Sequence, residues 1–328
     1  YDMSSFGKLM VEGRDSEAFL NYICGANMSV PLGKIIYTQF LNPTGGIEAD
    51  VTVTRLTETS YLVVTPAITR LADQTWMRRN KENFEVVITD VTSAEGVLAI
   101  MGPNSREFMN AISPNDFSNE TNPFGTAQKI EIGMGLARVH RVSYVGELGW
   151  EIYISTDMAA HVFETIMEYA NDSQLKLCGM HMVDSCRIEK GFRHFGHDIT
   201  CEDHVLEAGL GFAVDTEKVA FLGRNAVIAK KEEGLKMRMA QFLLKDAEPL
   251  LYHNEPIMRD GEIVGYLSSG NYGHALGGAV GMGYVPCEGE KPSDLLASSY
   301  EIDVAGNRVE AEISLKPLYD PTGARIKA

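Results

Sequence analysis

The sequence lacks any apolar run long enough to span a bilayer. Its first residues have neither the charged nor the apolar region of a secretory signal. These absences argue against a membrane partner and predict an intracellular protein, in the cytoplasm or, in a eukaryote, in the mitochondrial matrix. The chain also lacks an initiator Met and begins at Tyr1, which suggests a piece of a longer protein.

Positive charge is scarce, since 29 Lys and Arg residues face 45 Asp and Glu residues, for a net charge of −16. Such a balance repels phosphate backbones and argues against a nucleic-acid partner. The five cysteines are an odd number without CxxC spacing, so we expect free thiols. A length of 328 residues with 45% hydrophobic residues predicts a globular protein of two or three domains.

Several catalytic motifs are also missing. The sequence contains no GxGxxG, no GxxxxGK[ST], no G-x-S-x-G and no H-E-x-x-H, which argues against a nucleotide-phosphate cradle, a serine-hydrolase elbow and a zinc-peptidase site. The segment RHFGHDITCEDH, residues 193–204, is rich in possible ligands. Its spacing matches no known zinc pattern, so we expect no metal site there.

The first two thirds of the chain mix helical and strand patterns. Amphipathic periodicity predicts helices over 15–27, 69–84 and 158–172, and β-rich runs predict strands over 61–66, 84–92, 96–103 and 151–155. Helices and strands do not alternate strictly. The pattern therefore favours an α+β arrangement over a doubly wound parallel sheet.

The pattern changes after about residue 235. Asp260-Gly261 and Gly306-Asn307 each separate two alternating runs, which is typical of β-hairpins. The last ninety or so residues are thus expected to form a small all-β barrel. Residues 221–234, a helical pattern that ends in Gly234, form a plausible linker.

Two segments contain candidate functional carboxylates. A Gly45-Gly46 turn between two strand-like runs places Asp50 near the start of the second run, as a carboxylate on a rigid hairpin. In YVGELGWEIYIS, Glu147 and Glu151 flank an aromatic residue after a glycine turn. From the residues alone, these carboxylates are either ordinary polar strand positions or the contacts of a bound heterocycle.

Five motifs in order resemble the tetrahydrofolate-dependent aminomethyltransferase family, over essentially the whole chain. They are D-x-S-x-F-G-K at 2–8, L-N-x-x-G-G-x-x-x-D at 41–50, Y-x-G-E-x-G-x-E at 144–151, R-I-E-K-G at 187–191 and F-L-G-R at 221–224. The sequences of several of these motifs are most similar to the folate-binding C-terminal region of sarcosine and dimethylglycine dehydrogenases.

The resemblance implies roles for single residues. Asp50 matches the family aspartate beside the reactive edge of tetrahydrofolate, where a carboxylate can accept a proton and balance positive charge. Glu151 matches the glutamate that binds the pterin, whose parallel donors fit two carboxylate oxygens. Tyr37 and Tyr144 match tyrosines that line the folate pocket. Arg187 is a possible anchor for the folate carboxylates or, equally, part of a structural ion pair, and Arg193 is the other nearby cation.

The sequence departs from two branches of the family. The glycine-cleavage transferases carry an arginine where Val183 stands here, which favours the dehydrogenase branch. The folate-binding proteins linked to iron–sulfur assembly carry a cysteine after the Lys-Gly pair, where this chain has Phe192. That branch is therefore disfavoured.

The resemblance implies an α+β fold of three lobes, with two mixed lobes over 1–232 and a β-barrel over 236–328, around a central folate channel. The implied function is one-carbon transfer, in which tetrahydrofolate captures a methylene or formaldehyde unit from an N-methyl amine as 5,10-methylenetetrahydrofolate. FAD is expected only in a separate dehydrogenase domain. The alternatives are a stand-alone aminomethyltransferase of the glycine cleavage system, a tetrahydrofolate-dependent demethylase and a non-catalytic folate-binding module.

Overall fold

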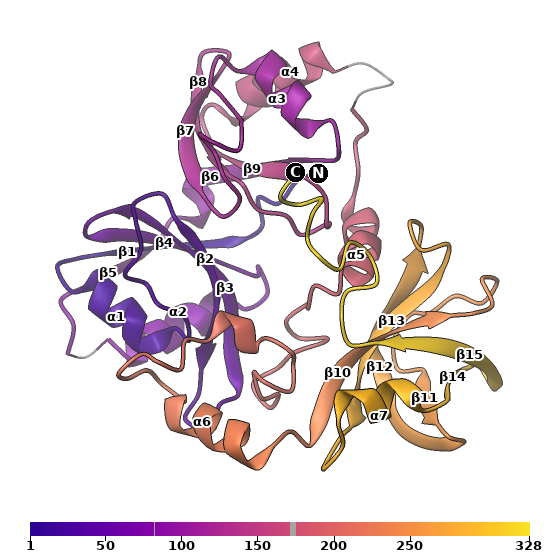
Figure 1. The fold of residues 1–328 in the computed structure, drawn as a ribbon. Coiled ribbons are helices and arrows are strands. Elements are labelled where there is room, and N and C mark those ends of the chain that lie inside the picture. The colour runs from indigo at the N-terminus through magenta and orange to yellow at the C-terminus, as the bar shows by residue number, and fades with distance from the viewer. Residues whose placement is uncertain (82, 171–174) are drawn as a thin grey trace.

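A computed structural model describes residues 1–81, 83–170 and 175–328 and divides them among three lobes (Figure 1). The first lobe is a five-stranded antiparallel sheet in the order β2-β3-β4-β1-β5. Its strands are β1 (Gly7–Glu12), β2 (Ile35–Leu41), β3 (Ile47–Thr57), β4 (Ser60–Thr65) and β5 (Val87–Asp90). Helices α1 (Ser16–Ile23) and α2 (Arg70–Arg79) contribute Phe19, Leu20 and Met77 to the core on one face of this sheet.

The second lobe is a four-stranded sheet in the order β6-β9-β8-β7. A short 3-10 turn, η1 (Thr92–Ala94), leads into it, and its elements are β6 (Glu95–Met101), α3 (Ser105–Ile112), β7 (Ala127–Ile132), β8 (Gly135–His140), β9 (Gly149–Ser155) and α4 (Ala159–Tyr169). Both helices cover one face, where Met109, Ile112, Val162 and Ile166 pack around the buried Trp150.

The uncovered faces of the two sheets meet. Leu62 and Val64 from β4 pack in one cluster with Val97 and Tyr153 from the second sheet. Paired strand residues point to the same side of a sheet, and alternate residues share a face. Since Val64 pairs with Thr52, the side of β3 that carries Asp50 and Thr52 faces the second lobe, and the side of β9 that carries Glu151 and Tyr153 faces the first.

The third lobe is a closed barrel of six strands, β10-β13-β12-β11-β14-β15. These are β10 (Met237–Leu244), β11 (Pro256–Arg259), β12 (Glu262–Gly273), β13 (Gly278–Pro286), β14 (Tyr300–Val304) and β15 (Asn307–Ser314), with α7 (Pro292–Ala297) inserted. Helix α5 (Met180–Glu189), η2 (Gly211–Ala213) and α6 (Arg224–Glu233) connect it to the other lobes. The predicted α+β fold with a C-terminal barrel is confirmed.

The glycines of β13 allow close strand approach. A Cβ on Gly283 would lie 2.5 Å from the carbonyl oxygen of Tyr266, and one on Gly281 would lie 2.7 Å from Leu267. Side chains there would force β12 and β13 apart.

A closing segment, residues 315–328, runs from the barrel back to the second lobe (Figure 1). Leu318 donates its N–H to Gln241 Oε1 of the barrel at 2.9 Å. Asp320 forms a buried ion pair of 2.9 Å with Lys190, just after α5. Arg325 contacts Glu147, in the loop before β9, at 3.3 Å. The segment thus joins the barrel, the end of α5 and the second lobe.

Three local predictions need correction or comment. The second hairpin turns at Ala305-Gly306, one residue earlier than predicted, because both turn residues take positive φ (52° and 89°) and Asn307 already pairs with Val304. The helix predicted over 158–172 is α4, which ends at Tyr169; residues 171–172 lie outside the described part. No helix of the described residues is long and apolar enough to cross a membrane.

Candidate functional site

The turn before Asp50 is built by glycine and asparagine. Gly45 has a φ of 83°, and a Cβ on Gly46 would lie 2.1 Å from the carbonyl oxygen of Cys201. Asn42 Oδ1 accepts the N–H groups of Thr44 at 3.0 Å and Gly46 at 2.9 Å. This turn fixes the register of β2 against β3 and therefore the position of the carboxylate.

Asp50 is held by two neighbours on β2. Gln39, its paired residue, donates Nε2–H to Asp50 Oδ1 at 2.8 Å. The hydroxyl of Tyr37, two residues earlier and on the same face, also donates to this carboxylate. Burial raises the pKa of Asp50 to about 6, and the two hydrogen bonds and the charge of Arg193 oppose that rise. The carboxyl group is thus ionised at neutral pH yet close to its titration range.

Aromatic rings border this carboxylate. Tyr37 is stacked on Phe212 of η2 with ring centroids 6.0 Å apart. Tyr144 is stacked on Phe192 at 6.0 Å, with the ring planes 7° apart, and donates its hydroxyl to the carbonyl oxygen of Arg193 at 3.0 Å. Burial raises the pKa of Tyr144, and the charges of Asp198 and Asp50 add to the rise while Arg187 opposes it. The structure therefore brings Tyr37, Tyr144 and Asp50 into one region.

Glu151 lies on the facing sheet of the second lobe. It is 7% exposed and accepts a hydrogen bond from the hydroxyl of Tyr153 at 2.9 Å. It forms no ion pair with any of the described residues. Burial raises the pKa of Glu151 to about 7, and the hydrogen bond from Tyr153 opposes that rise. A buried carboxylate without a cation needs donors from elsewhere, such as a ligand rich in N–H groups.

Arg187 is 3% exposed and its donors are occupied. Its guanidinium binds Asp184 with an N···O distance of 2.7 Å and Asp198 at 2.5 Å, and it donates to Ser269 Oγ of the barrel at 2.8 Å. Asp198 belongs to the ligand-rich segment 193–204, and it also accepts from Ser268 Oγ at 2.5 Å. Of the two roles left open by the sequence, this geometry favours the structural ion pair.

Arg193 is a different case. It donates Nε–H to the carbonyl oxygen of Ala208 at 3.0 Å and another N–H to that of Gly191. Within the described part of the chain it has no carboxylate within 4.0 Å, although its charge lowers the pKa of Asp50. Glu147, by contrast, is engaged by Tyr319 and Arg325. Arg193 is therefore the better placed cation for an anionic group near Asp50.

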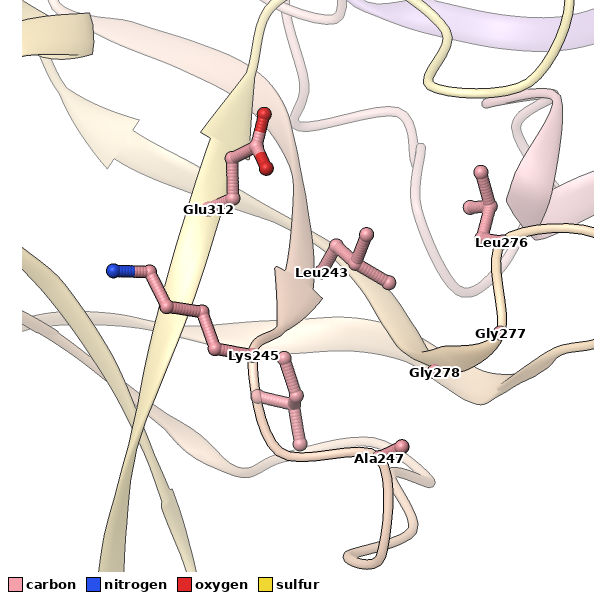
Figure 2. Close-up of a pocket in the computed structure, with 8 residues that line it drawn as sticks. Leu243, Lys245, Ala247, Leu276, Gly277, Gly278 and Glu312 are labelled. Carbon is pink, nitrogen blue, oxygen red and sulfur yellow. The ribbon is translucent and has the colours of Figure 1, made fainter.

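Two hollows lie away from these carboxylates. One, of about 270 Å³, is on the barrel between Leu243, Lys245, Leu276 and Glu312 (Figure 2). The other, of about 370 Å³, lies between Tyr22, Pro43 and the stretch around Phe221. Neither contains a residue predicted for the site.

The sequence reasoning missed three neighbours of the site. Gln39 could have been found, because a hairpin centred on the glycine turn pairs it with Asp50. Phe192 and Phe212 could not, because they reach the tyrosines from segments far along the chain. No local pattern marks such contacts.

Comparison with known proteins gives matches over most of the chain. Residues 1–218 match the GCVT N-terminal domain, and residues 238–320 match the glycine cleavage T-protein C-terminal barrel domain. The whole chain is 38% identical to 4-methylaminobutanoate oxidase (formaldehyde-forming) of Paenarthrobacter nicotinovorans and 32% identical to human mitochondrial sarcosine dehydrogenase. It spans only 39% and 38% of the length of these two relatives.

A third relative is similar in length. The aminomethyltransferase of Halothermothrix orenii is 32% identical, and the match covers 97% of this chain and 87% of that protein. The crystal structure of aminomethyltransferase T from Bartonella henselae superposes with a TM-score of 0.85 over 98% of this chain and 86% of its own, at 24% identity, and so shares the fold. The chain belongs to the glycine cleavage T-protein family of aminomethyltransferases.

Proposed function

We propose that this chain catalyses the tetrahydrofolate-dependent capture of a one-carbon unit, a methylene or formaldehyde group from an N-methyl amine, as 5,10-methylenetetrahydrofolate. Residues 1–232 would bind the folate, in a channel that the barrel of residues 236–328 helps to enclose. The observation that carries the proposal is the hydrogen-bonded, half-buried Asp50 in a family of folate-dependent transferases. A flavin dehydrogenase domain, with its FAD, is the proposed source of the unit, in line with relatives that are much longer.

The residues present fit a folate. Tetrahydrofolate supplies the two amine nitrogens that bond to the carbon, and water leaves when formaldehyde is the donor. Asp50, with a pKa of about 6, is suited to accept a proton from an amine and to balance positive charge. Glu151, buried and without a cationic partner in the described chain, is suited to a pair of N–H donors. Tyr37 and Tyr144 provide ring faces, and Arg193 provides positive charge for an anionic tail.

The test uses the full chain with tetrahydrofolate and a low concentration of isotopically labelled formaldehyde. Because formaldehyde and tetrahydrofolate also condense without enzyme, the quantity measured is the rate above that background. We expect label in 5,10-methylenetetrahydrofolate at a rate that depends on Asp50. Tight folate binding with no rate above background would instead support the non-catalytic module.

The relative from Halothermothrix orenii favours one alternative, a stand-alone aminomethyltransferase. That activity releases ammonia from an aminomethyl-loaded lipoyl carrier protein. Ammonia release with such a carrier, and no capture of formaldehyde, would replace our proposal. Formation of 5-methyltetrahydrofolate from a methyl donor would identify a demethylase.

We predict that Arg187→Lys destabilises the protein by about 1–3 kcal/mol, because an ammonium group cannot bond Asp184, Asp198 and Ser269 with one planar fork. Chemical denaturation measures the loss. Arg259→Lys, at the more exposed pair with Glu290, is the matched control and should have a smaller effect. Unchanged stability with tenfold weaker folate binding would make Arg187 a direct folate ligand.

A further inference from the structure

Gln39 is a fully buried amide next to the proposed reacting carboxylate. It lies on β2 directly opposite Asp50 on β3, so both side chains are on the face turned toward the second lobe. Its Nε2–H donates to Asp50 Oδ1 at 2.8 Å. Its Oε1 is buried and has no hydrogen-bond partner among the described residues. The amide is therefore anchored at one end only, by the carboxylate.

A primary amide has a donor and an acceptor on the same group, and a half-turn about its last torsion exchanges them. A carboxylate needs a donor, whereas the protonated acid needs an acceptor. A buried group that gains and loses a proton loses a hydrogen bond in one of the two states unless its partner can do both.

We propose that Gln39 is a positioning residue that holds Asp50 in both of its protonation states, donating to the carboxylate and accepting from the acid after its amide turns. The inference rests on the proposed function, in which Asp50 takes up and releases a proton. The unpartnered Oε1 is the feature that supports it, because turning the amide breaks no other hydrogen bond within the described part of the chain.

The other groups around Asp50 do not replace this amide. Tyr37 donates to the carboxylate, but to accept the proton of the acid it would have to turn its own O–H toward another acceptor. Arg193 has only donors, and the hydroxyl of Tyr144 is committed to the carbonyl of Arg193. Asp73 of α2, whose pKa is raised by burial and then by the charges of Glu48 and Asp50, adds negative potential to the region.

The experiment titrates Asp50 in the full chain without folate. Carbon-13 NMR of labelled aspartate follows the carboxyl signals, and the signal absent from Asp50→Asn assigns Asp50. Gln39→Leu keeps the size of the side chain but removes the hydrogen bond from both protonation states. We expect the pKa of Asp50 to rise by about one pH unit, since the bond lost from the charged form is stronger than the bond lost from the acid. The acid limb of the transfer rate should move by the same amount.

Gln241→Leu is the matched control, since Gln241 is a buried glutamine of β10 that donates to backbone carbonyls near the end of α5. It should leave the titration of Asp50 unchanged. An unchanged titration in folded Gln39→Leu overturns the inference, and so does a rise of about two pH units or more, which would mean that Gln39 bonds the carboxylate alone. If that variant does not fold, Gln39→Met is titrated in its place under the same criteria. The titration needs no folate, so a protein that captures no one-carbon unit refutes the proposed function separately.

Discussion

Replacing Asp50 by asparagine should lower the rate of one-carbon capture by about two to four orders of magnitude and leave folate affinity nearly unchanged. The substitution keeps the size of the side chain and its place opposite Gln39 on the β2–β3 hairpin. It removes the negative charge and the ability to accept a proton at neutral pH. Single-turnover rates and equilibrium binding of tetrahydrofolate, measured on the same preparations, separate the two effects.

Asp73→Asn is the matched control for this change. Asp73 is a buried carboxyl of the first lobe, and its pKa, like that of Asp50, is raised by desolvation to about 6. It accepts hydrogen bonds from Thr65 and Thr69 on the opposite face of the sheet. Asp73→Asn should change the rate of one-carbon capture by no more than a few fold. Equal losses of rate and affinity in Asp50→Asn would assign Asp50 to binding, and an unchanged rate would remove it from the reaction.

We expect the same carboxyl group to set the pH dependence of the rate of one-carbon capture. A base must be ionised to work, so the wild-type rate should fall as the pH drops through about 6, the pKa to which burial raises Asp50. In Asp50→Asn this acid limb should be absent. A limb that persists in the variant would belong to another group.

Replacing Glu151 by glutamine should weaken tetrahydrofolate binding by roughly 30-fold to 1,000-fold. A carboxylate can accept two parallel N–H bonds, whereas an amide offers one oxygen and turns its NH₂ group against the second donor. Because Glu151 is buried beside Tyr153 and has no cation in the described chain, no neighbour compensates for the loss. Calorimetric titration gives the two dissociation constants.

The affinity should also depend on pH. Burial raises the pKa of Glu151 to about 7, so the carboxylate that accepts the donors is lost as the pH falls below that value. Wild-type affinity should then fall by about tenfold per pH unit, and the dependence should disappear in Glu151→Gln. Glu147→Gln is the control, since Glu147 is bound by Tyr319 and Arg325. A larger loss of affinity at Glu147 than at Glu151 would exchange their roles.

Local sequence patterns predicted the turns and hairpins, whose conformation depends on neighbouring residues. Asp260-Gly261 marked its hairpin because positive φ at both positions is cheap only for such residues, and the structure has 52° and 91° there. The Gly45-Gly46 turn predicted the hairpin that carries Asp50, although only Gly45 has a positive φ and Gly46 is required by its close approach to the carbonyl oxygen of Cys201. The family roles of Asp50, Glu151, Tyr37 and Tyr144 remain predictions, although the structure places Asp50 and Glu151 on facing sheet surfaces.

Tertiary contacts set the limit of that reasoning. From the sequence alone, Arg187 could be an anchor for folate or part of a structural ion pair. Only the contacts of its guanidinium with Asp198 and Ser269 distinguish the two roles. The same holds for Phe212, which is 77% exposed and stacks on Tyr37 from a distant turn. A residue whose role depends on a partner outside its own helix or strand leaves no periodic signal.

The closing segment affects the order in which parts of the molecule can fold during synthesis. Lys190 is buried at the end of α5, yet its carboxylate partner Asp320 lies 130 residues later. A nascent chain that has made the first two lobes must keep this ammonium group hydrated until the barrel is complete, because a buried unpaired charge is costly. Synthesis of residues 315–328, rather than folding of any single lobe, then determines when this ammonium group can be buried.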